Sequence, residues 1–162
     1  DTQNSEMWYP RFRFAEALLI AAEAAYELGG VNKVKAVEYI NRVRARGGIK
    51  ELTESTITFE HIVNEYRVEF AFEDHRWWDL KRWRLAHTVW NGVIDSPTAQ
   101  MYSLFPYKVY APGSPYDGKW AFEKSRSYMA PNARNFTMRC YYGSIDDGWI
   151  NKNPKLVKNP LQ

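Results

Sequence analysis

The sequence has 162 residues, 45% of them hydrophobic and 25% charged, which suits one globular domain with a buried core. A formal net charge of +3 without any basic run argues against a nucleic-acid-binding protein. The single cysteine excludes an intrachain disulfide and a cysteine-based zinc site, and no apolar run reaches the length that spans a membrane.

The first ten residues are polar, and we expect an extended lead-in that ends at Pro10. Because the chain starts with Asp1 rather than Met and shows no signal peptide, we expect a processed protein or a fragment of a longer one. From Arg11 onward, alanine and larger apolar residues recur at helical spacing, which predicts a helix that ends at Gly29-Gly30. Its expected apolar face consists of Phe14, Ala15, Leu18, Ala22, Ala25 and Tyr26.

A second helix is predicted between Asn32, the expected N-cap, and Gly47-Gly48. Because so short a turn joins the two helices, they should pack antiparallel as a helical hairpin. The expected inner stripe of the second helix consists of Val34, Val37, Ile40 and Val43.

The stretch from Thr58 to Trp83 is the densest part of the chain in charge and aromatic residues. Thr58 is the expected N-cap of a third helix, and the polar triplet 73–75 predicts a bend after it. A short fourth helix should follow, with its tryptophans in the core. The apolar stripe of the third helix and the residues of the fourth are Phe59, Ile62, Val63, Tyr66 and Phe70, and then Trp77, Trp78, Leu80 and Trp83.

Three glutamates, Glu65, Glu69 and Glu73, lie four residues apart on one row of the third helix. Paired carboxylates can perform acid and base catalysis, as in glycoside hydrolysis. Arginines are abundant nearby, and the planar guanidinium matches a carboxylate, so a structural network of ion pairs is the favoured interpretation. We expect this network to include Arg44, Arg67, Glu69, Glu73 and Arg76.

After Asn91-Gly92 the helical spacing disappears, and proline and glycine recur. We expect long ordered loops there, with room for a short helix or hairpin. The tail, NKNPKLVKNPLQ, should be an extended strap, because a residue before proline is disfavoured in the helical region. The predicted organisation is a helical scaffold over residues 1–92 and a loop-rich extension with a C-terminal strap over residues 93–162, packed on the same domain.

Aromatic residues in the loop-rich region are candidates for ligand binding, because flat sugar faces stack on aromatic rings and loops at the surface carry binding residues. The alternative for each is packing of the loop onto the scaffold. The candidates are Tyr107, Tyr110, Tyr116, Trp120 and Trp149.

Other chemistries find little support in the sequence. His61 and Glu65 are four residues apart, but no His-Glu-x-x-His motif completes a metal site. Cys140 has no evident histidine base, and neither a Gly-x-Ser-x-Gly motif nor a phosphate-binding glycine loop occurs. We therefore predict no catalytic residue, no metal site and no cofactor.

Three motifs and the tail resemble the C-terminal half of the SusD/RagB family in both order and spacing. The motifs are RFAEALLIAAEAAYELGG, INRVRARGGI and EYRVEFAFEDHRWWDLKRW, and the tail matches at Asn153-Pro154, Leu156 and Asn159-Pro160. The family has an arginine where this chain has Tyr66, and a proline-containing segment usual before the tail is replaced by YYGSIDDGWI.

The resemblance implies a mainly α-helical fold in which helix pairs similar to tetratricopeptide repeats form the scaffold. It also implies a non-catalytic lipoprotein at the cell surface of Bacteroidota-type bacteria, anchored in the outer membrane. Such proteins bind glycans, or sometimes peptides, and cover a SusC-like TonB-dependent transporter.

Family members are far longer than 162 residues. An N-terminal part with the lipid-bearing cysteine is therefore expected outside this chain. The alternatives left open are a helix-repeat scaffold that binds a protein or peptide, and a carboxylate-based glycoside hydrolase.

Overall fold

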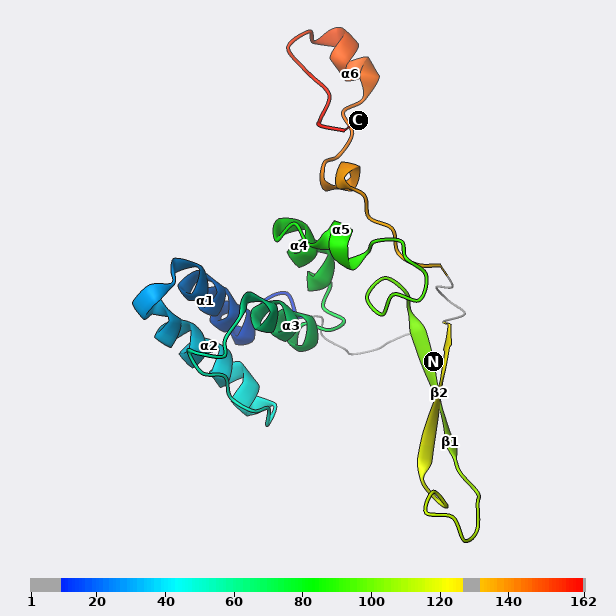
Figure 1. Ribbon diagram of the computed structural model, residues 1–162. Coiled ribbons are helices and arrows are strands. Elements are labelled where there is room, and N and C mark those ends of the chain that lie inside the picture. The colour runs from blue at the N-terminus through cyan, green and yellow to red at the C-terminus, as the bar shows by residue number, and fades with distance from the viewer. Residues whose placement is uncertain (1–9, 127–131, 162) are drawn as a thin grey trace, which may run out of the picture. The chain divides into compact units, whose positions relative to one another are not determined.

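The computed structural model describes residues 10–126 and 132–161, and the chain divides into two compact units between Asp79 and Leu80. The predicted lead-in falls almost wholly outside the described residues. The fold is mainly helical, as predicted, with one two-stranded sheet (Figure 1). In chain order the elements are α1 (Phe14–Leu28), a 3₁₀ turn (Gly30–Asn32), α2 (Lys33–Arg46), α3 (Phe59–Glu69), α4 (His75–Arg82), α5 (Ala86–Val89), β1 (Tyr102–Lys108), β2 (Trp120–Arg126), a second 3₁₀ turn (Met138–Tyr141) and α6 (Asp147–Lys152).

The first unit is built on the helical hairpin of α1 and α2, which lie side by side, while α3 packs against α1 (Figure 1). Gly29 ends α1 as predicted, since its φ of 64° is a conformation that other residues rarely adopt. The largest fully buried side chains of this unit are Leu19, Ile40 and Ile62. They fill the space between the three helices because each lies on the inner stripe of its own helix.

Two details of this hairpin differ from the prediction. Asn32 makes no capping bond with its side chain, because it closes the 3₁₀ turn in a helical conformation instead of the extended one that an N-cap needs. Phe14, which was predicted on the apolar face of α1, is exposed. Val34 is exposed as well, and the buried residues of α2 are Ala36, Ile40 and Val43. A small residue at position 36 allows the two helices to approach closely.

Helix α3 begins at the predicted cap. The Thr58 hydroxyl accepts a hydrogen bond from the backbone N–H of His61 (3.3 Å), and Nδ1 of His61 accepts one from the backbone N–H of Thr58 (3.2 Å). The chain leaves the helix after Glu69, earlier than the predicted bend, and turns through Phe72 and Asp74, which both have positive φ.

The prediction that the tryptophans of α4 belong to the core is wrong for two of them. Trp77 and Trp78 are 45% and 66% exposed, whereas Leu80 is fully buried and Trp83 is partly buried. A helix of eight residues presents only one narrow face to the core, and Asp79 and Leu80 occupy that face.

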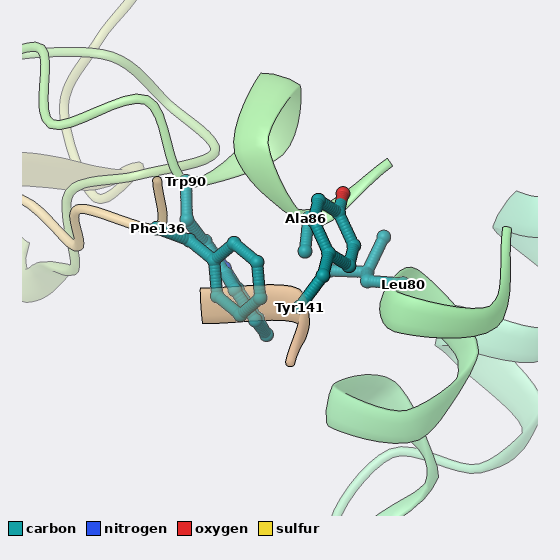
Figure 2. Packing of buried hydrophobic residues seen from close by; sticks show 5 residues of the cluster. All are labelled: Leu80, Ala86, Trp90, Phe136 and Tyr141. Atoms are coloured by element: carbon teal, nitrogen blue, oxygen red, sulfur yellow. The ribbon is translucent and has the colours of Figure 1, made fainter. Parts of the chain in front are cut away.

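The core of the second unit is an aromatic cluster around Leu80 and Ala86 (Figure 2). The ring of Phe136 lies between the other two aromatic rings, 6.2 Å from Trp90 and 4.9 Å from Tyr141, measured between centroids. Backbone hydrogen bonds hold the two chain segments together, since Phe136 N–H donates to the carbonyl of Trp90 (2.7 Å). The cluster thus ties α5 to the segment that follows the sheet.

The region after residue 93 contains the only sheet among the described residues, the antiparallel hairpin of β1 and β2. Tyr102 pairs with Arg126 at one end and Lys108 with Trp120 at the other. The short helix α6 starts at Asp146, whose side chain accepts a hydrogen bond from the backbone N–H of Gly148. No helix is formed by the described residues after Lys152, as expected for the Asn-Pro-rich tail.

Candidate functional site

Four of the five predicted ligand-binding aromatics lie on the β1–β2 hairpin. Tyr107 is on β1, Trp120 is on β2, and Tyr110 and Tyr116 are in the connecting loop, whereas Trp149 is on α6. Their exposed fractions are 52% for Tyr107, 88% for Tyr110, 66% for Tyr116, 64% for Trp120 and 66% for Trp149. None of these rings is therefore used to pack its loop into the core of the described residues.

The hairpin loop, residues 109–119, is held by its own hydrogen bonds. Val109 N–H donates to the carbonyl of Lys119, and Gly118 N–H donates to the carbonyl of Val109, both at 2.9 Å. Gly118 has a φ of 73°, which glycine adopts without strain. The Asp117 carboxylate accepts from the backbone N–H of Ala111 (2.9 Å), so Tyr110 and Tyr116 are carried by an ordered loop.

The strand register places the candidate rings on opposite faces of the hairpin. Side chains alternate between faces along a strand, and directly paired residues share a face. Trp120 pairs with Lys108, whereas Tyr107 pairs with Ala121, so Trp120 and Tyr107 point to opposite faces. We call the first the Trp120 face and the second the Tyr107 face. The Trp120 face comprises Tyr102, Leu104, Pro106, Lys108, Trp120, Phe122 and Lys124, and the Tyr107 face comprises Ser103, Phe105, Tyr107, Ala121, Glu123 and Ser125.

Three large apolar residues of the hairpin were not among the sequence candidates. Leu104, Phe105 and Phe122 are 62%, 61% and 62% exposed. The missed signal is a run of aromatic residues on either side of a Pro-Gly-rich loop, which is the pattern of a hairpin. Trp120 and Phe122 follow each other on one face, about 7 Å apart along the strand. A sugar chain could stack on such a pair of rings.

Lysines add polar groups to the same surface. Nζ of Lys124 lies 3.7 Å from the centroid of the Tyr102 ring, and Nζ of Lys119 lies 5.5 Å from that of Tyr116. The Trp120 face thus combines flat apolar rings with amines that can donate hydrogen bonds to hydroxyl groups. This combination is typical of sites that bind polar ligands with apolar faces.

The row of glutamates in the first unit is fully paired with arginines. Nη1 of Arg44 lies 2.6 Å from Oε2 of Glu65. Arg13 contacts Oε1 of Glu69 (2.5 Å) and Oε2 of Glu73 (2.8 Å), and these hydrogen bonds, that of Glu73 first, raise the pKa of Arg13. Arg46 also contacts Oε1 of Glu69 (2.5 Å). Three of the predicted members, Arg44, Glu69 and Glu73, thus lie in ion pairs, as does Glu65 of the same glutamate row. Arg13 and Arg46 were not among the predicted members.

The other two predicted members, Arg67 and Arg76, are placed differently. Arg67 is exposed. Arg76 has a buried Nη1 without a hydrogen-bond partner among the described residues. Burial, and next the positive charge of Arg67, lower the pKa of Arg76, while Asp79 acts in the opposite direction.

A hollow of about 350 Å³ lies next to the same helices and is rich in carboxylates. Its lining consists of Glu16, Glu73, Asp74, His75, Trp78 and Asp79. In the part of the chain that the structure describes, no group of three or more histidine, cysteine or acidic side chains has the arrangement of a metal site.

The model of the SusD family matches residues 1–161. The chain belongs to the SusD family. The resemblance inferred from the three motifs is thereby confirmed.

The relatives of this SusD-family chain are much longer than the chain itself. It is 37% identical over 107 residues to SusD-like protein P2 of Formosa agariphila, which covers 59% of the chain and 21% of the relative. It is 33% identical over 107 residues to the starch-binding protein SusD of Bacteroides thetaiotaomicron, covering 62% of the chain and 18% of that relative. The chain therefore spans about a fifth of the length of these two curated relatives.

A solved structure supports the fold of the SusD-family chain. The crystal structure of a SusD superfamily protein from Bacteroides vulgatus has a TM-score of 0.54 and 22% sequence identity. The match covers 93% of this chain and 27% of that protein. At this identity, the likeness concerns the fold alone.

Proposed function

We propose that this chain is part of a non-catalytic, cell-surface glycan-binding protein that serves uptake through a SusC-like TonB-dependent transporter. Membership of the SusD family supports the proposal, and so does the relative named starch-binding protein SusD. The observation that carries it at the level of residues is the exposed pair Trp120 and Phe122 on one face of the hairpin.

The chemistry of sugars explains why this pair suits a glycan. A pyranose ring has an apolar face of C–H groups that packs on an aromatic ring and a rim of hydroxyls that needs polar partners. Trp120 and Phe122 offer two successive rings, and Lys108 and Lys124 lie on the same face. We assign the primary contact to the Trp120 face, because the Tyr107 face has its rings, Phe105 and Tyr107, only on β1.

The carboxylates of the first unit support a non-catalytic role. A glycosidase needs one carboxyl group kept protonated and a second one free to attack or to activate water. Glu65, Glu69 and Glu73 all accept charge-assisted hydrogen bonds from arginines instead. These bonds engage one oxygen of each carboxylate that the reaction would need.

We place the protein at the outer membrane, with a lipid anchor on a segment N-terminal to this chain. Within residues 10–126 and 132–161, no helix combines the length and apolar character needed to cross a bilayer. Attachment through a lipid and docking on a transporter are parts of the proposal that concern the longer protein.

Isothermal titration calorimetry against plant, host and microbial oligosaccharides tests the proposal, with hydrolysis products measured in the same samples. We expect binding without product, and an affinity about tenfold lower for Trp120→Ala, which corresponds to about 1.4 kcal/mol. Phe122→Ala should weaken binding similarly. Phe12→Ala, which removes an aromatic ring that is 86% exposed outside the hairpin, should leave the affinity unchanged.

Each other outcome contradicts a part of the proposal. Sugar hydrolysis would overturn the non-catalytic role and direct attention back to the glutamates. A larger loss for Tyr107→Ala than for Trp120→Ala would move the site to the Tyr107 face. Binding of peptides instead of glycans would favour the alternative of a scaffold that recognises polypeptides.

A further inference from the structure

The α3–α4 corner has an unusual surface. We use this name for Arg67, Val68, Phe72, Arg76 and Trp77, which lie at the end of α3, in the following turn and at the start of α4. Val68 is 57% exposed, Phe72 is fully exposed at 102%, and Trp77 is 45% exposed. Phe72 also has a φ of 67°, a strained conformation for a residue with a side chain. A large apolar side chain held in solvent by a strained backbone gains nothing unless something covers it.

The charges of the corner point to the kind of group that covers it. The buried Nη1 of Arg76 has no hydrogen-bond partner in the described part of the chain, and Arg67 places a second positive charge near it. The neighbouring arginines Arg13 and Arg44 are each paired with glutamates. Arg76 as a whole is only partly buried, and a carboxylate is the acceptor that best matches the planar fork of a guanidinium.

We infer that the α3–α4 corner is an interface that receives a carboxylate-bearing segment from the remainder of the longer SusD-family chain. The inference rests on the proposed function, in which this chain is one part of a longer protein. The corner combines arginine, tryptophan and exposed apolar side chains, and the centres of interfaces are rich in arginine and aromatic residues.

The length of the relatives argues for the same chain as the source of the carboxylate. About four fifths of each of the two curated relatives lies outside the matched region, since the matches cover 21% and 18% of their lengths. A tethered segment is present at high effective concentration, so a single ion pair with a modest apolar contact suffices to hold it. A free sugar would satisfy the arginines but would not require Phe72 and Val68 beside them.

Zero-length cross-linking of the longer protein with a carbodiimide tests the inference. The variant Arg76→Lys introduces an amine that forms an amide bond with a contacting carboxylate. We expect the dominant cross-link to join position 76 to an aspartate or glutamate outside this chain. The exposed native amine of Lys35 in the same sample reports the background. A cross-link only to Asp79 or Glu73, or to a second copy or a different protein, would overturn the inference.

Hydroxyl-radical footprinting gives an independent measurement. In the longer protein we expect slow oxidation of Phe72 and Trp77, and a several-fold increase in the double variant Arg67→Glu/Arg76→Glu. Lys35→Glu, which also reverses an exposed charge, should change neither rate. If the double variant loses its helical circular dichroism, Arg67→Glu alone supplies the comparison, since Arg67 is exposed and its substitution disturbs no described ion pair.

Two results of the footprint would contradict the interface. Equal oxidation in the wild type and in the charge-reversed variant would show that nothing covers the corner. If excess acetate changed the protection of Phe72 and Trp77 from oxidation, the arginines would instead bind a small free anion. The proposed interface can be disproved while Trp120→Ala still lowers glycan affinity. Equally, the interface can be supported while Trp120→Ala has no effect, so the two proposals are tested separately.

Discussion

At the scale of single residues, the arginines of the first unit show how differently one side chain can be used. Arg44 is largely buried and bonded to Glu65, whose side chain is 5% exposed. Its Nε and Nη2 also donate to the carbonyl of Lys50, at 2.9 and 2.6 Å. One guanidinium therefore joins α2, the connector after it and α3. Arg76 is also partly buried, but its Nη1 has no hydrogen-bond partner among the described residues.

We predict that Arg44→Met lowers the free energy of unfolding by roughly 3–5 kcal/mol, because it leaves the buried Glu65 carboxylate without its cation. Urea denaturation followed by circular dichroism measures the change. The double variant Arg44→Met/Glu65→Met should recover much of the loss, since it removes both charges. Lys35→Met, an exposed change on the same helix, is the matched control and should have little effect. An equal loss of unfolding free energy for Arg44→Met and Lys35→Met would mean that the ion pair contributes no more to stability than an exposed lysine.

At the scale of elements, local chemistry decides where the helices begin and end. Thr58 is extended, with φ −127° and ψ 163°, and its side chain satisfies one of the N–H groups that the first turn of α3 leaves open. His61 completes the exchange with its ring nitrogen, a role that glutamate or glutamine usually has. The start of α3 is thereby fixed by two residues three positions apart.

We predict that Thr58→Ala lowers the free energy of unfolding by about 1 kcal/mol, within the range of about 0.5–2 kcal/mol known for N-caps. The same denaturation measurement applies. Thr88→Ala, at an exposed position on α5, should change stability much less. The cap would lose its importance if Thr58→Ala and Thr88→Ala were equally mild, or if His61→Ala alone accounted for the whole effect.

Features that depend on near neighbours in the sequence were predictable, whereas contacts between distant residues were not. The end of α1 at Gly29 and the cap at Thr58 depend on neighbours within a few residues, and both were predictable. The turn before α4 was also predicted, but the chain leaves α3 earlier than expected. The pairing of Arg13 with Glu69 and Glu73 spans more than fifty residues, so no local pattern indicated it. The prediction that Trp77 and Trp78 are core residues is wrong, because membership of a helical motif does not show which face of the helix is buried.

The sequence indicated which aromatic rings lie at the surface, but not how they are arranged. Exposed aromatics beside proline and glycine identified the hairpin loop and Trp120. The division into a Trp120 face and a Tyr107 face depends on the strand register, which a shift of one residue would invert. Phe122, which lies next to Trp120 on the same face of β2, is therefore identified only from the strand register.

At the scale of the whole molecule, the hairpin is notable because many of its large apolar side chains are exposed. A two-stranded ribbon is only marginally stable by itself, and this one exposes large apolar side chains on both faces. Its two outer edges also differ. Pro106 pairs with Phe122 and has no N–H to offer outward, which blunts the edge of β1. The edge of β2 has no such proline, so its outward backbone groups are available for pairing.

We therefore predict that the chain of 162 residues self-associates through the Trp120 face and the edge of β2. Sedimentation velocity should show a concentration-dependent rise in sedimentation coefficient, and a dye that binds exposed apolar surface should fluoresce strongly. Leu104→Thr/Phe122→Thr keeps β-branched residues in the strands while it removes apolar area from that face, so both signals should fall several-fold. Phe12→Thr/Ile20→Thr removes exposed apolar residues outside the hairpin and should leave both signals nearly unchanged. Equal reductions by the two double variants would mean that association depends on total apolar surface, and the hairpin would then have no special part in it.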